Sequence, residues 1–167
     1  IALAGIYADT GNFLYENVTN EDFQVASYLM ENGASIPLIR KFLKILTDKS
    51  QISLFYDIVN RLTYKYINGH FVILSYIEIA EQVGGMAAVI EKIFEVERAD
   101  AIFCVFHINK NEQNVIIARS NKDRINVNEI LQHFNGGGHV RAASASIKDQ
   151  SGMMVFGTLE EHLKSVI

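Results

Sequence analysis

The sequence is poor in several features on which whole classes of proteins depend. It contains one cysteine, Cys104, which excludes an internal disulfide and fits a reducing compartment. Cys104 lies in an apolar run, where a free cysteine is usually buried. The longest apolar runs, 71–80 and 99–108, are too short to span a bilayer and carry polar residues. These absences exclude an internally disulfide-linked scaffold and predict a cytoplasmic protein with no membrane segment.

Excess positive charge is absent as well. The chain has 15 Lys and Arg against 19 Asp and Glu, which gives a formal net charge of −4. A general nucleic-acid-binding surface needs clustered Lys and Arg to neutralise phosphates. A polyanion, if this protein binds one, must therefore be held at one local site.

What is present is a globular composition without low-complexity segments or internal repeats. The 167 residues are 49% hydrophobic, enough for one ordinary core or two small ones. The chain opens on an apolar run at Ile1, without an initiator Met or a charged signal-peptide region. We therefore expect it to begin inside a larger domain.

The first part of the chain has helical periodicity. A first helix is expected between Thr19, as N-cap, and Gly33, as stop, and a second follows from Ser35. A third spans 50 to about 67, with apolar residues on one face, until Asn68–Gly69 ends the pattern in a turn. This division predicts an N-terminal unit over 1–48 and a connecting helix over 49–68.

Beyond the turn the hydrophobic period changes towards two, and strands alternate with helices. Thr158 is the expected N-cap of the last helix, with Glu161 completing a capping box. The expected order is strand 70–79, helix 84–100, strand 101–109, hairpin loop 110–114, strand 115–120, helix 125–134, strand 142–148 and a closing helix from 158. We predict an α/β (α+β) domain with a small mixed sheet over 69–167.

One carboxylate near the N-terminus has a context suited to metal binding. Asp9 follows an apolar, strand-like run and precedes a Thr-Gly turn, so that a ligand could approach it closely. A turn-forming or helix-capping role is the alternative.

The run HFNGGGHVRAASASI, residues 133–147, concentrates glycines in a chain where they are otherwise scattered. Gly136, Gly137 and Gly138 can expose successive backbone amides and form an anion-binding concavity, and His139 can donate to a phosphoryl oxygen. A purely structural loop is the alternative interpretation.

A second element strengthens the phosphate hypothesis. Arg119 and Ser120 end a predicted strand shortly before the helix that leads into the glycines, and they offer a guanidinium and a hydroxyl donor. These two residues, the glycine amides and His139 could converge on one anion. Arg141 either joins them or, by strand alternation, points outwards.

Together these segments resemble a known family. Residues 5–13 resemble the last metal-binding motif of the DHH phosphoesterases, and 118–121, 125–131 and 135–147 resemble the DHH-associated substrate-binding domain that follows it. Residues 84–106 are most similar to the branch linked to CBS-type domains and tRNA nucleotidyltransferase or poly(A) polymerase modules. The oligoribonuclease and 3′-phosphoadenosine-phosphate phosphatase branch is the close alternative. Departures are Asn135, Val140 and the absence of the Asp-His-His signature.

The resemblance implies a function divided between this chain and a longer parent. The parent is expected to hydrolyse nucleotide or short oligonucleotide phosphates with Mn²⁺ or Mg²⁺, and Asp9 is implied as one metal ligand. This chain is then the remnant of the catalytic domain plus the substrate-binding domain, without a stably bound metal or hydrolytic activity of its own. The implied partner is a nucleotide or single-stranded oligonucleotide phosphate, and uncovered surface predicts a homodimer. A nucleotide-sensing regulatory or assembly domain is the alternative function.

Overall fold

The computed structural model describes all residues except 1, 11–12, 17 and 37–47. The chain forms two compact units, Ile1–Ile45 and Leu46–Ile167. The second predicted helix, from Ser35, falls mainly on 37–47 and so lies outside the described residues.

The first unit contains two helices around a small core. Helix α1 covers Ala2–Asp9 and helix α2 covers Asn20–Glu31. Thr19 is the N-cap of α2, and its backbone amide donates to Asp22 Oδ2 at 2.8 Å, which confirms the predicted start. Gly33, with φ +92°, follows the end of the helix as expected. The strand-like reading of the residues before Asp9 was wrong, because they form α1.

The second unit is built on a six-stranded mixed sheet, which confirms the predicted fold class. The strand order is β1-β2-β3-β4-β6-β5, and only the β2–β3 pair is parallel. The strands are β1 Thr63–Ile67, β2 His70–Ile79, β3 Ala101–Ile108, β4 Gln113–Ser120, β5 Gly137–His139 and β6 Ala142–Lys148. A 3₁₀ turn, Asn109–Asn111, joins β3 to β4 at the predicted hairpin loop.

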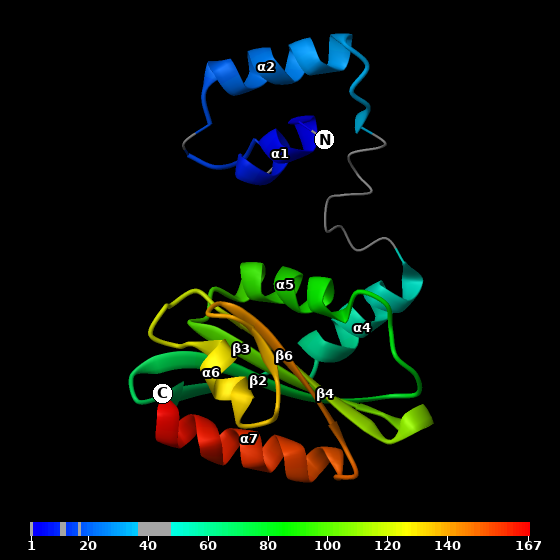
Figure 1. The fold of residues 1–167 in the computed structure, drawn as a ribbon, viewed down its shortest axis with the longest axis vertical. Coiled ribbons are helices and arrows are strands. Elements are labelled where there is room, and N and C mark those ends of the chain that lie inside the picture. Colours follow the sequence, from blue (N-terminus) through cyan, green and yellow to red (C-terminus); the bar gives the residue numbers. More distant parts are fainter. Residues whose placement is uncertain (1, 11–12, 17, 37–47) are drawn as a thin grey trace. The chain divides into compact units, whose positions relative to one another are not determined.

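Helices cover both faces of this sheet (Figure 1). On one face, α4 (Lys49–Val59) and α5 (Met86–Glu97) share a core with β2 and β3. On the other, α6 (Val127–Gln132) and α7 (Gly152–Val166) pack against the central strands. Cys104 of β3 is fully buried in the first core, and burial raises the pKa of its thiol. The expected structural role of Cys104 is confirmed.

The structure corrects two predicted helices. The expected helix over 50–67 stops at Val59, and residues 63–67 form the edge strand β1. Asn68 (φ +47°) and Gly69 (φ +87°) then close a two-residue hairpin into β2, a geometry that needs positive φ at both central residues. The last helix begins at Gly152 with Ser151 as N-cap, so Thr158 lies within the helix and does not cap it. Within the described ranges, no helix is long and apolar enough to cross a membrane.

Candidate functional site

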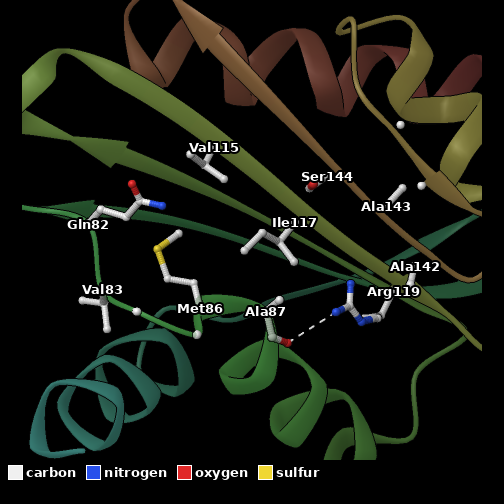
Figure 2. Close-up of a pocket in the computed structure, with 14 residues that line it drawn as sticks. Gln82, Val83, Met86, Ala87, Val115, Ile117, Arg119, Ala142, Ala143 and Ser144 are labelled. Atoms are coloured by element: carbon white, nitrogen blue, oxygen red, sulfur yellow. Dashed lines mark hydrogen bonds between the residues drawn. The ribbon is translucent and has the colours of Figure 1, made fainter.

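A pocket of about 630 Å³ opens on the α5 side of the sheet (Figure 2). It is bounded by the turn before α5 with the first residues of that helix, by β4, and by the edge formed by β5 and β6. The lining residues are Gln82, Val83, Gly84, Gly85, Met86, Ala87, Val115, Ile117, Arg119, Gly137, Gly138, Ala142, Ala143 and Ser144. Arg119, Gly137 and Gly138, three of the residues predicted for one anion site, thus line one pocket.

Arg119 is the charged member of the described lining, and its guanidinium is held from several sides. Its Nε donates to Glu91 Oε2 at 2.8 Å and its Nη1 to the Ala118 carbonyl at 2.9 Å. The Nη2 atom lies 3.5 Å from the carbonyl oxygen of Ala87 in the first turn of α5, a contact drawn in Figure 2. Only 12% of the side chain is exposed. The guanidinium therefore has a fixed position beside the pocket.

Ser120 points to the opposite face of the sheet, because successive strand residues alternate between faces. Its side chain is buried, and Oγ lies 2.9 Å from the Lys122 carbonyl and accepts from the Lys122 amide at 3.0 Å. The structure therefore does not bring Ser120 to the same group as Arg119. Its hydroxyl closes the turn after β4 instead.

The glycine run is an edge strand rather than a free loop. Gly137, Gly138 and His139 form β5 and pair with Ser144, Ala143 and Ala142 of β6. A Cβ on Gly138 would lie 2.3 Å from the Ala142 carbonyl oxygen. On Gly136, which does not line the pocket, it would lie 2.6 Å from the Ser144 carbonyl oxygen. Close packing of the two strands thus explains two of the three glycines.

Gly137 has no such structural reason. A Cβ built there would meet nothing within 4 Å, and its φ is outside the left-handed region. The same holds for Gly84, which lines the opposite wall of the pocket. The described protein atoms do not require glycine at either position, and both positions leave open space beside the backbone at the pocket.

The N-terminus of α5 is part of the site and was missed from the sequence. Gly85 is its N-cap, in a left-handed conformation with φ +73°, and no side chain of the described residues caps the first turn. Free amides at the start of a helix carry partial positive charge and favour anions. The signal was the Gly84–Gly85 pair directly before an apolar helical stretch.

His139 and Arg141 lie away from the described lining of the pocket. His139 ends β5 with an exposed side chain. Arg141, in the turn to β6, is exposed, and its Nε donates to Asp123 Oδ1 at 2.8 Å, which lowers the pKa of Asp123. Arg141 thus follows the outward alternative.

Asp9 ends α1 in the first unit, with an exposed side chain. Among the described residues there is no group of three or more His, Cys, Asp or Glu that could hold a metal ion. A dinuclear site needs several ligands, so these residues do not fit one by themselves. Metal binding by Asp9 stays a prediction.

Comparison with known families identifies the domain that carries this pocket. Residues 64–166 match the sequence model of the DHHA1 domain. The chain belongs to the DHHA1 domain family. The resemblance inferred from the sequence motifs is thereby confirmed.

DHHA1 relatives of this chain occur as parts of longer proteins. It is 29% identical over 167 residues to an A-adding tRNA nucleotidyltransferase of Geobacter sulfurreducens, covering 100% of this chain and 19% of that protein. It is 31% identical over 161 residues to the cyclic-di-AMP phosphodiesterase GdpP of Bacillus subtilis, covering 95% of this chain and 23% of that protein. The chain thus spans about a fifth of these relatives.

Solved structures support the fold assignment. An exopolyphosphatase-related protein from Bacteroides fragilis superposes with a TM-score of 0.64 at 20% identity, covering 96% of this chain and 49% of that one. The C-Ala domain of alanyl-tRNA synthetase from Aquifex aeolicus gives a TM-score of 0.50 at 15% identity, covering 61% of this chain and 98% of that one. At these identities the likeness concerns the fold alone.

Proposed function

We propose that the DHHA1 pocket binds the phosphate group of a nucleotide or single-stranded oligonucleotide, as the substrate-holding part of a longer metal-dependent phosphoesterase. The observation that carries this proposal is the position of Arg119 between two walls, each containing a glycine that packing does not require. A guanidinium binds phosphate through paired donors, and the backbone next to Gly84 and Gly137 lets a ligand approach closely. The activities of two relatives, an A-adding tRNA nucleotidyltransferase and a cyclic-di-AMP phosphodiesterase, support a nucleotide ligand.

Binding and positioning are the roles of this chain's own residues in that proposal. Arg119 and the amides at the start of α5 would hold the anion, and the apolar side chains Val115, Ile117 and Met86 would contact the less polar part of a nucleotide. Mn²⁺ or Mg²⁺, where the intact protein binds it, would polarise the scissile phosphate, with Asp9 as one proposed ligand. In this proposal the cleavage step belongs to the longer protein.

Replacing Arg119 tests the proposal. The wild-type chain is titrated with adenosine 5′-monophosphate and with a short oligoribonucleotide, with calorimetric detection of binding. Arg119→Gln should weaken binding at least about tenfold, because charge-assisted hydrogen bonds to phosphate are lost. Arg141→Gln, an arginine outside the pocket lining, serves as control and should change affinity less than about twofold. Equal affinity of wild type and Arg119→Gln would refute the proposal.

A nucleotide-sensing or assembly role in a tRNA nucleotidyltransferase-type protein is the second candidate. Alignment along all 167 residues with the Geobacter sulfurreducens nucleotidyltransferase favours it. Phosphate-ester turnover by the full-length parent with Mn²⁺ would count against this candidate. The predicted homodimer is open to test by sedimentation equilibrium of the same chain.

A further inference from the structure

The pocket has a second polar end, which is formed by the side chain of Gln82. Figure 2 shows the Gln82 amide and the Arg119 guanidinium entering the pocket from opposite sides, with Met86 and Ile117 between them. Met86 and Ile117 are buried apolar residues of the pocket lining. A ligand that fills the pocket therefore meets hydrogen-bonding groups at two ends and an apolar surface between them.

The pocket is much longer than one phosphate group. Val115, Ile117 and Arg119 are alternate residues of β4, so their side chains lie on one face of the sheet along about 13 Å of strand. All three line the pocket. A ligand whose phosphate is bound by Arg119 can thus extend over apolar side chains towards Gln82.

The turn that carries Gln82 is held by hydrogen bonds on both sides of this residue. Before it, the Lys110 amide donates to the Ala80 carbonyl at 3.0 Å. After it, Gln51 Nε2 donates to the Gly84 carbonyl at 2.8 Å. The backbone at Gln82 therefore has a defined position, although it lies in a turn between β2 and α5.

The Gln82 amide itself has no hydrogen-bond partner among the described residues. The side-chain amides of Gln51 and Gln113, in contrast, donate to other groups of the protein. A side-chain amide has an acceptor oxygen next to a nitrogen with two donors. Gln82 can therefore bind a ligand group that presents a donor and an acceptor side by side.

We propose that Gln82 is a specificity-determining residue that recognises the base of an adenine nucleotide whose phosphate is held by Arg119. This inference rests on the proposed function, and it names the substrate class within it. Of the four DNA bases, adenine alone presents a donor, N6, beside an acceptor, N7, along its major-groove edge, and glutamine pairs with both. The apolar side chains between the two ends would contact the ribose and the purine ring.

The test compares two ligands that differ only in the amino group on C6 of the purine. Adenosine 5′-monophosphate and purine riboside 5′-monophosphate, which has hydrogen at that position, are titrated into the wild-type chain with calorimetric detection. The wild type should bind the adenosine nucleotide about fivefold more tightly, because the other nucleotide lacks one hydrogen bond to Gln82.

Replacing Gln82 should remove this preference. Gln82→Met keeps the approximate length of the side chain but has no donor and only a weak acceptor. It should bind the two nucleotides with affinities within about twofold of each other. Gln82→Ala should lose the preference as well, so the inference does not depend on the folding of one variant.

Gln132→Met is the matched control. Gln132 is an exposed glutamine at the end of α6 and is not among the described residues that line this pocket. Its substitution should leave the ratio of the two affinities within about twofold of the wild-type ratio.

Arg119→Gln separates this inference from the proposed function. If it weakens binding of both nucleotides, but the wild type binds them equally or the Gln82 variants retain the preference, the inference is overturned and the proposed function stands. If the binding of neither nucleotide depends on Arg119, the proposed function fails and the inference fails with it. A preference for the adenosine nucleotide that is lost in the Gln82 variants and kept in Gln132→Met supports the inference.

Discussion

Gly136, Gly137 and Gly138 are adjacent in the chain but meet different requirements. Gly136, just before β5, and Gly138, within it, lie so close to the backbone of β6 that a Cβ atom on either would overlap it. Gly137 points into open space at the pocket. A single tripeptide therefore combines strand packing with access for a ligand, and substitution can separate the two.

We predict that alanine substitutions at Gly137 and Gly138 affect different properties of the protein. Gly138→Ala should lower the free energy of unfolding by about 2–4 kcal/mol, because the new methyl group would overlap the backbone of Ala142 and Ala143. Gly137→Ala should change stability by less than about 0.5 kcal/mol and weaken nucleotide binding. Urea denaturation and calorimetric titration of both variants measure these effects.

Two results would contradict separate roles for Gly137 and Gly138. If Gly137→Ala destabilises the protein as much as Gly138→Ala, then the glycine has a structural role that the described packing does not show. If it leaves both stability and binding unchanged, the backbone at Gly137 does not contact the ligand.

Some residues of the site could be predicted from the sequence and others could not. Arg119 was identified because arginine at a strand end near a glycine run favours phosphate binding, and it does line the pocket. Ser120 was grouped with it on sequence proximity, although alternation along β4 places it on the other face. The ion pair with Glu91 could not be predicted, because it joins residues 28 positions apart through the packing of α5 on β4.

At the scale of elements, the start of α7 gives a test of helix capping. Ser151 Oγ accepts from the Met154 amide at 3.2 Å, as a serine N-cap does. Thr158, which is followed by Glu161 at the spacing of a capping box, is exposed within the helix. The sequence alone does not decide between two such positions separated by two turns.

We therefore predict that Ser151→Ala lowers the free energy of unfolding by about 1 kcal/mol, the usual cost of losing a serine cap. Thr158→Ala should be neutral or slightly stabilising, since alanine has the higher helix propensity. Thermal and urea denaturation of the two variants provide the comparison. A larger loss for Thr158→Ala would mean that the helix begins later than it does here.

The edge strand β1 shows why periodicity failed at one element. Leu62 and Tyr66 continue the spacing of the apolar face of α4, so the pattern alone extends the helix across 63–67. The Asn68–Gly69 turn was recognised, but as the end of a helix rather than as a hairpin. Pairing with β2 overrides the helical pattern, because residues 63–67 find backbone partners along 70–74.

For the whole second unit, the titrating groups predict a stability that falls in two stages as the pH decreases. Burial, and then the imidazole of His133 stacked at 4.2 Å, lower the pKa of His162 below its usual 6.5. The folded state therefore disfavours protonated His162. Stability should be constant above about pH 7 and begin to fall as the pH drops through 6.5, where the unfolded chain binds the proton first.

The second stage comes from carboxylates whose pKa is lowered in the folded state. The hydrogen bond from Lys65 to Glu160, which links β1 to α7, lowers the pKa of Glu160 below 4.5. The hydrogen bond from the Phe71 amide likewise lowers the pKa of Asp100 below its usual 3.8. The stabilisation by Glu160 and Asp100 is fully present above these usual pKa values. It is lost as the pH falls through the lower pKa that each group has in the folded state.

Melting temperatures measured from about pH 8 to pH 3 separate these two stages. His162→Gln should remove the decline that begins near 6.5, and Glu160→Gln should reduce the one below 4.5. An unchanged first decline in His162→Gln would assign that stage to another group.

The overall architecture could be predicted from the sequence, because the hydrophobic periodicity and the alternation of strands and helices are both clear between residues 70 and 148. Strands such as 101–108 are long, apolar and rich in β-branched or aromatic residues, so local preference and tertiary position agree there. The strand order, in which β6 lies between β4 and β5, depends on contacts distant in the chain. That order forms the pocket, so its complete lining became visible only in the folded molecule.

Because Cys104 lies at the centre of the sheet, the reaction rate of its thiol can report how often the core of the protein opens. The chain has one sulfhydryl, and it is fully buried in β3, in the interior of the sheet. An alkylating reagent added to the native protein has a single target, which becomes reachable only when the core around it separates. The mass gained over time would report how often that separation occurs, with no label introduced and no residue changed.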